Sequence, residues 1–213
     1  MQKVHKKMTG KKITNLPFIP HSSSNTGGVE ASLIDVGKRL VAAGLTYSRM
    51  GNISARAGDM MLISATGSFL DRLKGEIVKV PLDAGEPPSR ASSDALIHLG
   101  IYLRTEARGI VHTHSPFLVA LSALIRAHAF RPLDIEGRYY LGEIPIVSGA
   151  TGSRNLARAL ARELQTHPCA VVRFHGAFAR GESLYDAFHY VACAEHSCMV
   201  KYLVLLAQRT KKR

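Results

Sequence analysis

Apolar residues recur at helical spacing in five segments of the chain. In the first segment, Leu33, Val36 and Leu40 repeat every three or four residues, and Gly44 stands where a helix C-terminus favours glycine. This pattern predicts a helix over residues 29–43. Ser92 or Ser93 is a plausible N-cap for a second helix that continues to about residue 106. The remaining predicted helices cover residues 116–126, 153–165 and 184–208.

Shorter apolar runs, bounded by turn-forming residues, predict strands between these helices. They cover residues 60–64, 77–80, 109–115, 142–147 and 169–174. Residues 50–54 and 65–68 are small and polar and are interpreted as loops whose backbone could approach a phosphate, although ordinary turns explain them equally well. Strands interleaved with helices indicate an α/β class in which helices cover a sheet.

The two ends of the chain differ in composition from its body. Residues 1–28 carry five lysines and no acidic residue and end in a polar, glycine-rich run, which predicts a flexible basic arm. Residues 209–213 form a basic tail, and residues 29–208 form the folded domain. Most of the formal net charge of +12 therefore belongs to the ends. Because no reader motif accompanies this charge, specific nucleic-acid binding is not expected.

Length and composition are typical of a soluble globular protein. The 213 residues suffice for one domain with a core of its own. No apolar run approaches the roughly 20 residues that span a bilayer, and the N-terminus lacks the pattern of a secretory signal. The three cysteines form no CxxC pair, as expected of reduced thiols. We therefore expect a cytoplasmic protein that does not enter a membrane.

The segment His112-Thr113-His114 is the first candidate for chemistry. Residues two apart on a strand point to the same side, so both imidazoles could approach one metal ion. The alternative is a pair of ordinary histidines on a half-exposed strand. His175 precedes Gly176 at the end of a predicted strand and could supply a third imidazole, but spacing alone does not select it among the other histidines. Three histidines with an open position are typical of catalytic zinc.

Ser92-Ser93-Asp94 at a predicted helix start is the second candidate. Hydroxyls and free backbone N–H groups at the positive end of a helix make an anion site, and Asp94 could act as a general base or stand beside a metal. An ordinary capping segment explains the same residues.

Five motifs occur in the order and approximate spacing of the class II aldolase/adducin family, which the chain resembles over roughly residues 30–205. The motifs are Gly51-Asn52-Ile53-Ser54, Thr66-Gly67, Ser92-Ser93-Asp94, His112-Thr113-His114 and Phe174-His175-Gly176, and Gly181, Ala187 and Glu195 match the closing helix. The family includes L-fuculose-1-phosphate aldolase and L-ribulose-5-phosphate 4-epimerase.

The resemblance implies a fold, a site and a reaction. The fold is a three-layer α/β/α arrangement with a central, mostly antiparallel sheet flanked by helices, often assembled as a tetramer. His112, His114 and His175 would hold one zinc ion per chain, which would act as a Lewis acid. Asp94 is the candidate acid or base. The residues that would hold a substrate phosphate are Gly51, Asn52, Thr66, Gly67, Ser92 and Ser93.

The chain departs from the family in its proton donor. Enzymes of the family carry a catalytic tyrosine on a C-terminal tail, whereas residues 209–213 contain no tyrosine. Tyr202 is interpreted as a packing residue. Asp134, Glu136 and Tyr139 are possible substitutes, but each is better explained as a surface residue. The proton donor is therefore unassigned.

The resulting hypothesis is a zinc-dependent aldolase that acts on a small ketose phosphate and yields dihydroxyacetone phosphate and an aldehyde. A sugar-phosphate 4-epimerase, or a dehydratase or decarboxylase on the same scaffold, is the alternative within this enzyme class. From another class comes a non-catalytic, adducin-like interaction protein that has lost its metal ligands. The presence of all three histidines favours the enzyme.

Overall fold

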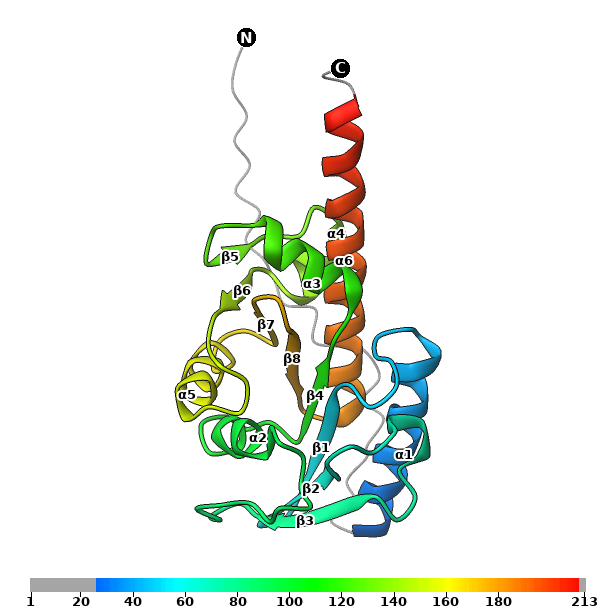
Figure 1. Ribbon diagram of the computed structural model, residues 1–213, viewed down its shortest axis with the longest axis vertical. Coiled ribbons are helices and arrows are strands. Elements are labelled where there is room, and N and C mark those ends of the chain that lie inside the picture. Colours follow the sequence, from blue (N-terminus) through cyan, green and yellow to red (C-terminus); the bar gives the residue numbers. More distant parts are fainter. Residues whose placement is uncertain (1–25, 211–213) are drawn as a thin grey trace, which may run out of the picture.

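A single mixed sheet forms the centre of the molecule (Figure 1). The computed structural model describes residues 26–210. Eight strands stand in the order β3-β2-β1-β4-β8-β7-β6-β5, and every neighbouring pair is antiparallel except β6 and β7. The strands are β1 (Asn52–Ala57), β2 (Met60–Ser64), β3 (Ile77–Pro81), β4 (Gly109–Thr113), β5 (Ala129–Phe130), β6 (Ile144–Val147), β7 (Cys169–Val172) and β8 (Gly176–Gly181).

Helices cover both faces of this sheet. The helices are α1 (Thr26–Ala42), α2 (Ala95–Tyr102), α3 (Pro116–Leu124), α4 (Ile135–Tyr140), α5 (Arg154–Glu163) and α6 (Leu184–Thr210), with a 3-10 turn at Leu70–Arg72. One apolar core joins the sheet to α1, α3 and α6, and a second core joins its other face to α2 and α5 (Figure 1). The fold is therefore the three-layer α/β/α arrangement, with a mostly antiparallel sheet, that the family resemblance implies.

The predicted elements recur with shifted ends. The strand over 60–64 and the left-handed Gly44 after α1 are confirmed. The helix expected at Ser92 or Ser93 begins only at Ala95, with Asp94 as the N-cap residue. The first helix begins at Thr26, so residues 26–28 belong to it and not to the predicted arm. Likewise α6 includes Arg209; residues 1–25 and 211–213 lie outside the described residues.

Two central strands were missed by the pattern of apolar residues. Residues 52–54, interpreted as a loop, belong to β1, because Asn52 and Ser54 are polar yet buried in this strand. Strand β8 begins and ends in glycine and was not predicted. A Cβ atom at Gly176 would stand 2.0 Å from the Thr113 carbonyl oxygen, so close strand packing requires glycine there. Both strands flank β4, which carries His112.

Helix α6 combines a buried part with an apolar end. By length and composition alone it could cross a membrane. Its first half is nevertheless a core helix, because Leu184, Val191 and Cys198 are buried against the sheet. Its last turns project beyond the body (Figure 1) and expose large apolar side chains at Leu203, Val204, Leu205 and Leu206. All three cysteines of the chain are free thiols, as expected.

Candidate active site

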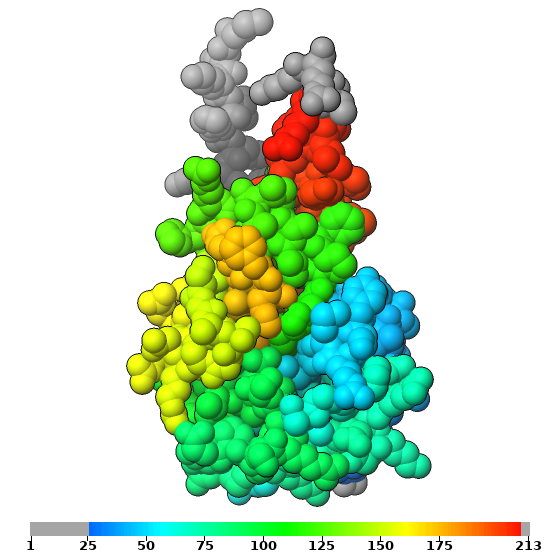
Figure 2. Space-filling view, in the orientation of Figure 1, coloured from blue at the N-terminus to red at the C-terminus, as the bar shows by residue number. Residues whose placement is uncertain are grey.

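A pocket of about 270 Å³ collects nearly all of the predicted site residues. It opens where the ends of β1, β2 and β4 meet the start of α2 and the turn between β7 and β8. In Figure 2 the orange turn around residue 175 reaches the surface between the yellow and green parts of the chain. The predicted residues on the pocket wall are Gly51, Asn52, Thr66, Gly67, Ser92, Ser93, Asp94, His114 and His175.

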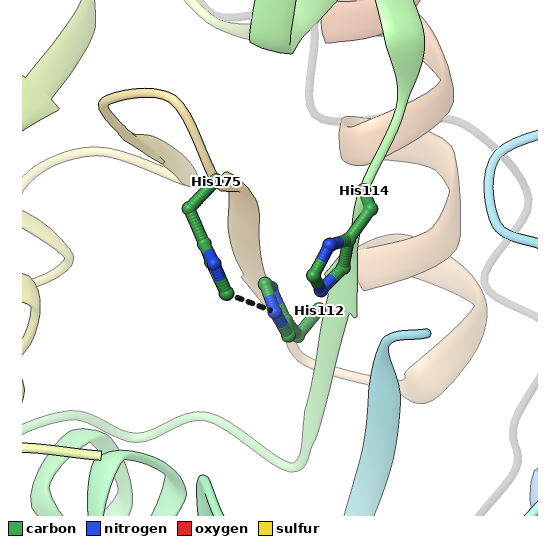
Figure 3. A group of neighbouring side chains, drawn as sticks. All are labelled: His112, His114 and His175. Carbon is green, nitrogen blue, oxygen red and sulfur yellow. Dashed lines mark hydrogen bonds between the residues drawn. The ribbon is translucent and has the colours of Figure 1, made fainter. Parts of the chain in front are cut away.

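His112, His114 and His175 converge at the end of strand β4 (Figure 3). Their potential ligand nitrogens all lie within 4.8 Å of one another, and His112 Nε2 is 3.1 Å from His175 Nε2. Two nitrogens on one tetrahedral zinc are about 3.4 Å apart, given Zn–N bonds of about 2.0–2.1 Å. The spacing of the three imidazoles therefore suits a single metal ion, and the structure brings together the histidines that the sequence predicted.

The protonation of the three imidazoles also suits a metal. The Nδ1 atom of the buried His112 lies 2.9 Å from the Ala177 carbonyl oxygen and can only donate to it, which leaves the Nε2 lone pair free for a ligand bond. Burial lowers the pKa of all three groups, that of His112 well below its usual value and that of His114 to about 4. They are therefore neutral near pH 7, as metal ligands must be.

A backbone clamp fixes the turn that presents His175. The Arg173 guanidinium donates to the carbonyl oxygens of Ser122 and Ile125, where helix α3 ends, and the Phe174 amide donates to Ser122 Oγ at 3.0 Å. Phe174 itself has a φ of +62°, which is uncommon for a residue other than glycine. These hydrogen bonds thus hold Phe174 in a strained backbone conformation, and the next side chain, that of His175, points toward His112.

Asp94 lies on the pocket wall beside the histidine cluster. Its Oδ2 atom is 3.7 Å from His112 Nε2 and accepts a hydrogen bond of 2.9 Å from the Asn52 amide. Asn52 stands opposite His112 in the register of β1 and β4. The pairing of β1 with β4 therefore brings the Asn52 side chain next to His112. The Asp94 carboxylate, which comes from the start of α2, contacts both of them.

Loops with small residues form another part of the pocket wall. An isolated bridge between Ala65 and Ala91 places the turn at Thr66 and Gly67 beside Ser92 and Ser93. The turn is closed by Ser68, whose hydroxyl donates to the Ala65 carbonyl oxygen at 2.8 Å. Gly51 and Gly67 have positive φ angles of 79° and 70°. Their backbones can therefore line the pocket without side chains that would fill it.

Two residues of the wall were missed by sequence reasoning. Thr151 comes from the loop before α5, and Arg49 precedes the glycine at position 51. The Arg49 guanidinium lies 5.1 Å from the centre of the Phe69 ring, and no carboxylate of the described residues lies within ion-pair distance of it. Arg49 is the one lysine or arginine on the wall. The sequence signal for Arg49 would have been a basic residue two positions before the glycine of a candidate phosphate-binding loop.

The suggested substitutes for the proton donor lie elsewhere. Asp134 caps α4 and accepts hydrogen bonds from the Gly137 amide and from Ser197 on α6. Glu136 and Tyr139 are exposed on α4, and none of the three lines the pocket. Tyr202 packs beside Phe117, with ring centres 5.7 Å apart, as expected of a packing residue.

The chain is similar to known proteins both in sequence and in fold. A sequence model described as "Class II Aldolase and Adducin N-terminal domain" matches residues 31–202. The crystal structure of L-fuculose-1-phosphate aldolase from Thermus thermophilus superposes with a TM-score of 0.80 and 34% identity, over 84% of this chain and 95% of that one.

Other relatives have different names. The 3-oxo-tetronate 4-phosphate decarboxylase of Haemophilus influenzae is 30% identical over 73% of this chain and 78% of its own length. The methylthioribulose-1-phosphate dehydratase of Methylococcus capsulatus is 27% identical over 78% of this chain and 89% of its own length. Proteins similar to this chain are thus named for three different reactions.

Proposed function

Because the chain belongs to the class II aldolase/adducin family, we propose that it is a zinc-dependent aldolase that cleaves or forms a carbon–carbon bond in a small ketose phosphate. The products of cleavage would be dihydroxyacetone phosphate and an aldehyde. The observation that carries this proposal is the convergence of three neutral imidazoles at one pocket, which two of them line together with hydroxyls and glycine backbone.

The histidine cluster is the proposed holder of one zinc ion per chain, and its donor set of three imidazoles is typical of catalytic zinc. When bound, the ion would supply Lewis-acid stabilisation of the negative charge that develops when the carbon–carbon bond breaks. Asp94 is the proposed acid or base, because its carboxylate lines the pocket 3.7 Å from His112 Nε2.

The loop wall is the proposed site of the substrate phosphate. Hydroxyls of Thr66, Ser92 and Ser93 and the backbones of Gly51 and Gly67 face a pocket at the start of helix α2, where the helix dipole favours an anion. Arg49 adds a positive charge to this wall, and a guanidinium binds phosphate well. Binding the phosphate there would orient the rest of the substrate toward the histidines.

A dehydratase or decarboxylase of a sugar phosphate is the second candidate. Its support is the pair of similar proteins named for those reactions, which match this chain over nearly the same length as the aldolase does. A sugar-phosphate 4-epimerase would use the same pocket and the same bond cleavage. A non-catalytic adducin-like protein is disfavoured, because the three candidate metal ligands are present and converge.

We also propose a cytoplasmic homo-oligomer, with a tetramer as the family-based expectation. The exposed apolar end of α6, at Leu203, Val204, Leu205 and Leu206, supports association. Neither a membrane nor a nucleic acid is part of this proposal.

A substrate panel with metal analysis tests the function. Purified protein should contain about one zinc per chain, and a chelator should remove both the zinc and the activity. Dihydroxyacetone phosphate with a set of aldehydes tests the aldolase, and ribulose 5-phosphate, methylthioribulose 1-phosphate and 3-oxo-tetronate 4-phosphate test the alternatives. A zinc-free protein that folds and processes none of these compounds would contradict the enzyme proposal.

A further inference from the structure

A chain of buried polar side chains runs from the pocket into the layer between β1 and α2. Its members are Asp94, Asn52, His98, Ser54 and Tyr102, and each has at most 7% of its surface exposed. Asn52 joins Asp94 Oδ2 at 2.9 Å and His98 Nε2 at 2.7 Å. Ser54 Oγ joins His98 Nδ1 at 2.7 Å and the Tyr102 hydroxyl at 2.9 Å. Helix α2 supplies His98 and Tyr102, and β1 supplies Asn52 and Ser54.

The donor and the acceptor of each hydrogen bond in this network can be assigned by starting at Tyr102, the member farthest from the pocket along the network. Burial raises the pKa of Tyr102, so its hydroxyl keeps the proton and can donate it to Ser54 Oγ. The Ser54 hydroxyl then donates to His98 Nδ1. Burial lowers the pKa of His98 to about 3, so the ring is neutral and, with Nδ1 accepting, carries its hydrogen on Nε2. The Nε2–H group donates a hydrogen bond to Asn52 Oδ1. This fixes the side-chain amide of Asn52 with its NH₂ group toward Asp94.

Every link in this direction joins a donor to an acceptor. No atom of the five side chains belongs to the described buried polar atoms that lack a partner. A fully satisfied buried network fixes its members in one arrangement, because any rotated group would lose a hydrogen bond in a medium of low dielectric constant. Asp94 Oδ1 takes part in no hydrogen bond among the described residues, so one carboxylate oxygen is held and the other is left for the pocket.

We propose that Ser54, His98 and Tyr102 are positioning residues: they fix the amide orientation of Asn52, which in turn holds the carboxylate of Asp94 at the pocket. Asn52 thereby acts on Asp94, in addition to any contact that its second amide hydrogen makes with a substrate. The inference rests on the proposed catalytic role of Asp94. It extends the site to a phenol that does not line the pocket.

The first test compares two buried serines on neighbouring strands. Ser54→Ala breaks the chain, whereas Ser64→Ala removes a buried hydroxyl of β2 that accepts from the Ile53 amide and lies outside the chain. We expect Ser54→Ala to lower kcat about ten- to hundredfold, as loss of an outer hydrogen-bond partner does, with KM and zinc content nearly unchanged. Ser64→Ala should lose stability only. Equal kcat values in the two variants would overturn the proposal.

A double-mutant cycle tests whether Ser54 acts through Asn52. In an Asn52→Ala background, Ser54→Ala should lower kcat no further, because the amide that it orients is gone. Additive losses would contradict the proposed route. If Ser54→Ala does not fold, Tyr102→Phe takes its place in the cycle, because this substitution removes only the hydroxyl and keeps the ring. Tyr102→Phe should lower kcat in the wild-type background but not in the Asn52→Ala background.

Nitrogen NMR of histidine-labelled protein tests the direction of the chain without any substrate. His98 should carry its hydrogen on Nε2, with Nδ1 unprotonated, and its signals are identified by their loss in His98→Gln. A hydrogen on Nδ1 would reverse the chain and overturn the proposal. Wild-type protein that is inactive on the whole substrate panel would instead contradict the proposed function, while the NMR result would still decide the orientation of Asn52.

Discussion

The two walls of the pocket are built in different ways. The metal wall is the histidine cluster: His114 and His175 line the pocket, and the fully buried His112 lies next to them. These side chains come from β4, from the residue after it, and from the turn before β8. The loop wall, formed by Gly51, Thr66, Gly67, Ser92 and Ser93, consists of backbone and small groups, of which Thr66, Gly67 and Ser93 are exposed. One wall thus depends on the identity of its side chains, and the other on the path of its backbone.

This difference assigns different consequences to mutation. On the metal wall a substitution removes a ligand whose place no neighbour can take, because the surrounding residues are packed. On the loop wall the removal of one hydroxyl leaves several other donors. A substitution on the loop wall is therefore expected to lower activity chiefly where its new side chain displaces the backbone.

The largest effect is expected for His112→Ala. Loss of a buried ligand should abolish zinc binding and lower kcat/KM at least about a thousandfold, because several kcal/mol of charge stabilisation disappear. Elemental analysis and steady-state kinetics measure both quantities. His128→Ala, which changes an exposed histidine outside the pocket, is the control and should behave as the wild type. An active, zinc-containing His112→Ala protein would remove this residue from the site.

Two buried histidines, His112 of the metal wall and His98 of helix α2 outside it, should also make the metal-free protein sensitive to acid, whereas the glycines, serines and threonine of the loop wall do not titrate. Burial lowers the pKa of His98 to about 3, and that of His112 well below its usual value. Below pH 6.5 the unfolded chain takes up protons that the folded chain excludes, so the free energy of unfolding falls. Each of these two histidines contributes up to about 1.4 kcal/mol per pH unit.

Chemical denaturation at pH 7, 6 and 5 measures this loss. The stabilising contribution is fully present above pH 6.5 and disappears progressively as the pH falls toward the folded-state pKa values. The slope of the unfolding free energy against pH reports how many protons the protein takes up on unfolding. In His98→Gln this number should be smaller by about one. A free energy of unfolding that is constant between pH 7 and 5 would show that the buried imidazoles are not neutral in the folded protein.

Gly51→Ala tests the backbone of the loop wall. A Cβ atom there would lie 2.6 Å from the His112 carbonyl oxygen, on a residue with a φ of +79°. We expect kcat/KM to fall about ten- to hundredfold, because the wall must shift away from β4. Gly58→Ala is the matched control: its φ is also positive, at +64°, but no atom of the described neighbours lies within 4 Å of an added Cβ. Comparable activities in the two variants would mean that the close approach does not position the wall.

The smallest effect is expected for Arg49→Gln. Loss of an exposed charge should raise KM for a phosphorylated substrate roughly three- to tenfold and leave kcat nearly unchanged, because the remaining hydroxyls and amides still bind the phosphate. Arg72→Gln is the control, because Arg72 also lies next to the Phe69 ring, at 5.8 Å, but outside the pocket. An unphosphorylated analogue should not distinguish the variants. Equal KM values for Arg49→Gln and Arg72→Gln would exclude a phosphate contact.

The sequence predicted a strand well where nearly all of its residues are apolar, and poorly where several of its residues are polar but buried. Strand β2 was predicted with its bounds, because its residues are apolar and turns flank it. The first residues of strand β1, 52–54, were interpreted as part of a loop, because the segment 50–54 is small and polar. The polarity of Asn52 and Ser54 is compatible with burial only because His98 and Asp94, more than 40 positions away, satisfy their hydrogen bonds. Such pairing has no local signature.

The sequence by itself determined the family of this protein and its candidate metal ligands, because motif order identifies the family and thereby selects His175 among ten histidines. Only the tertiary structure decided how these groups act on one another. It set His112 Nε2 toward His175, joined Asn52 to Asp94 and placed Arg49 on the pocket wall. The physical reason is that residue type fixes which bonds a group can make, whereas partners distant in sequence meet only when strands and helices pack.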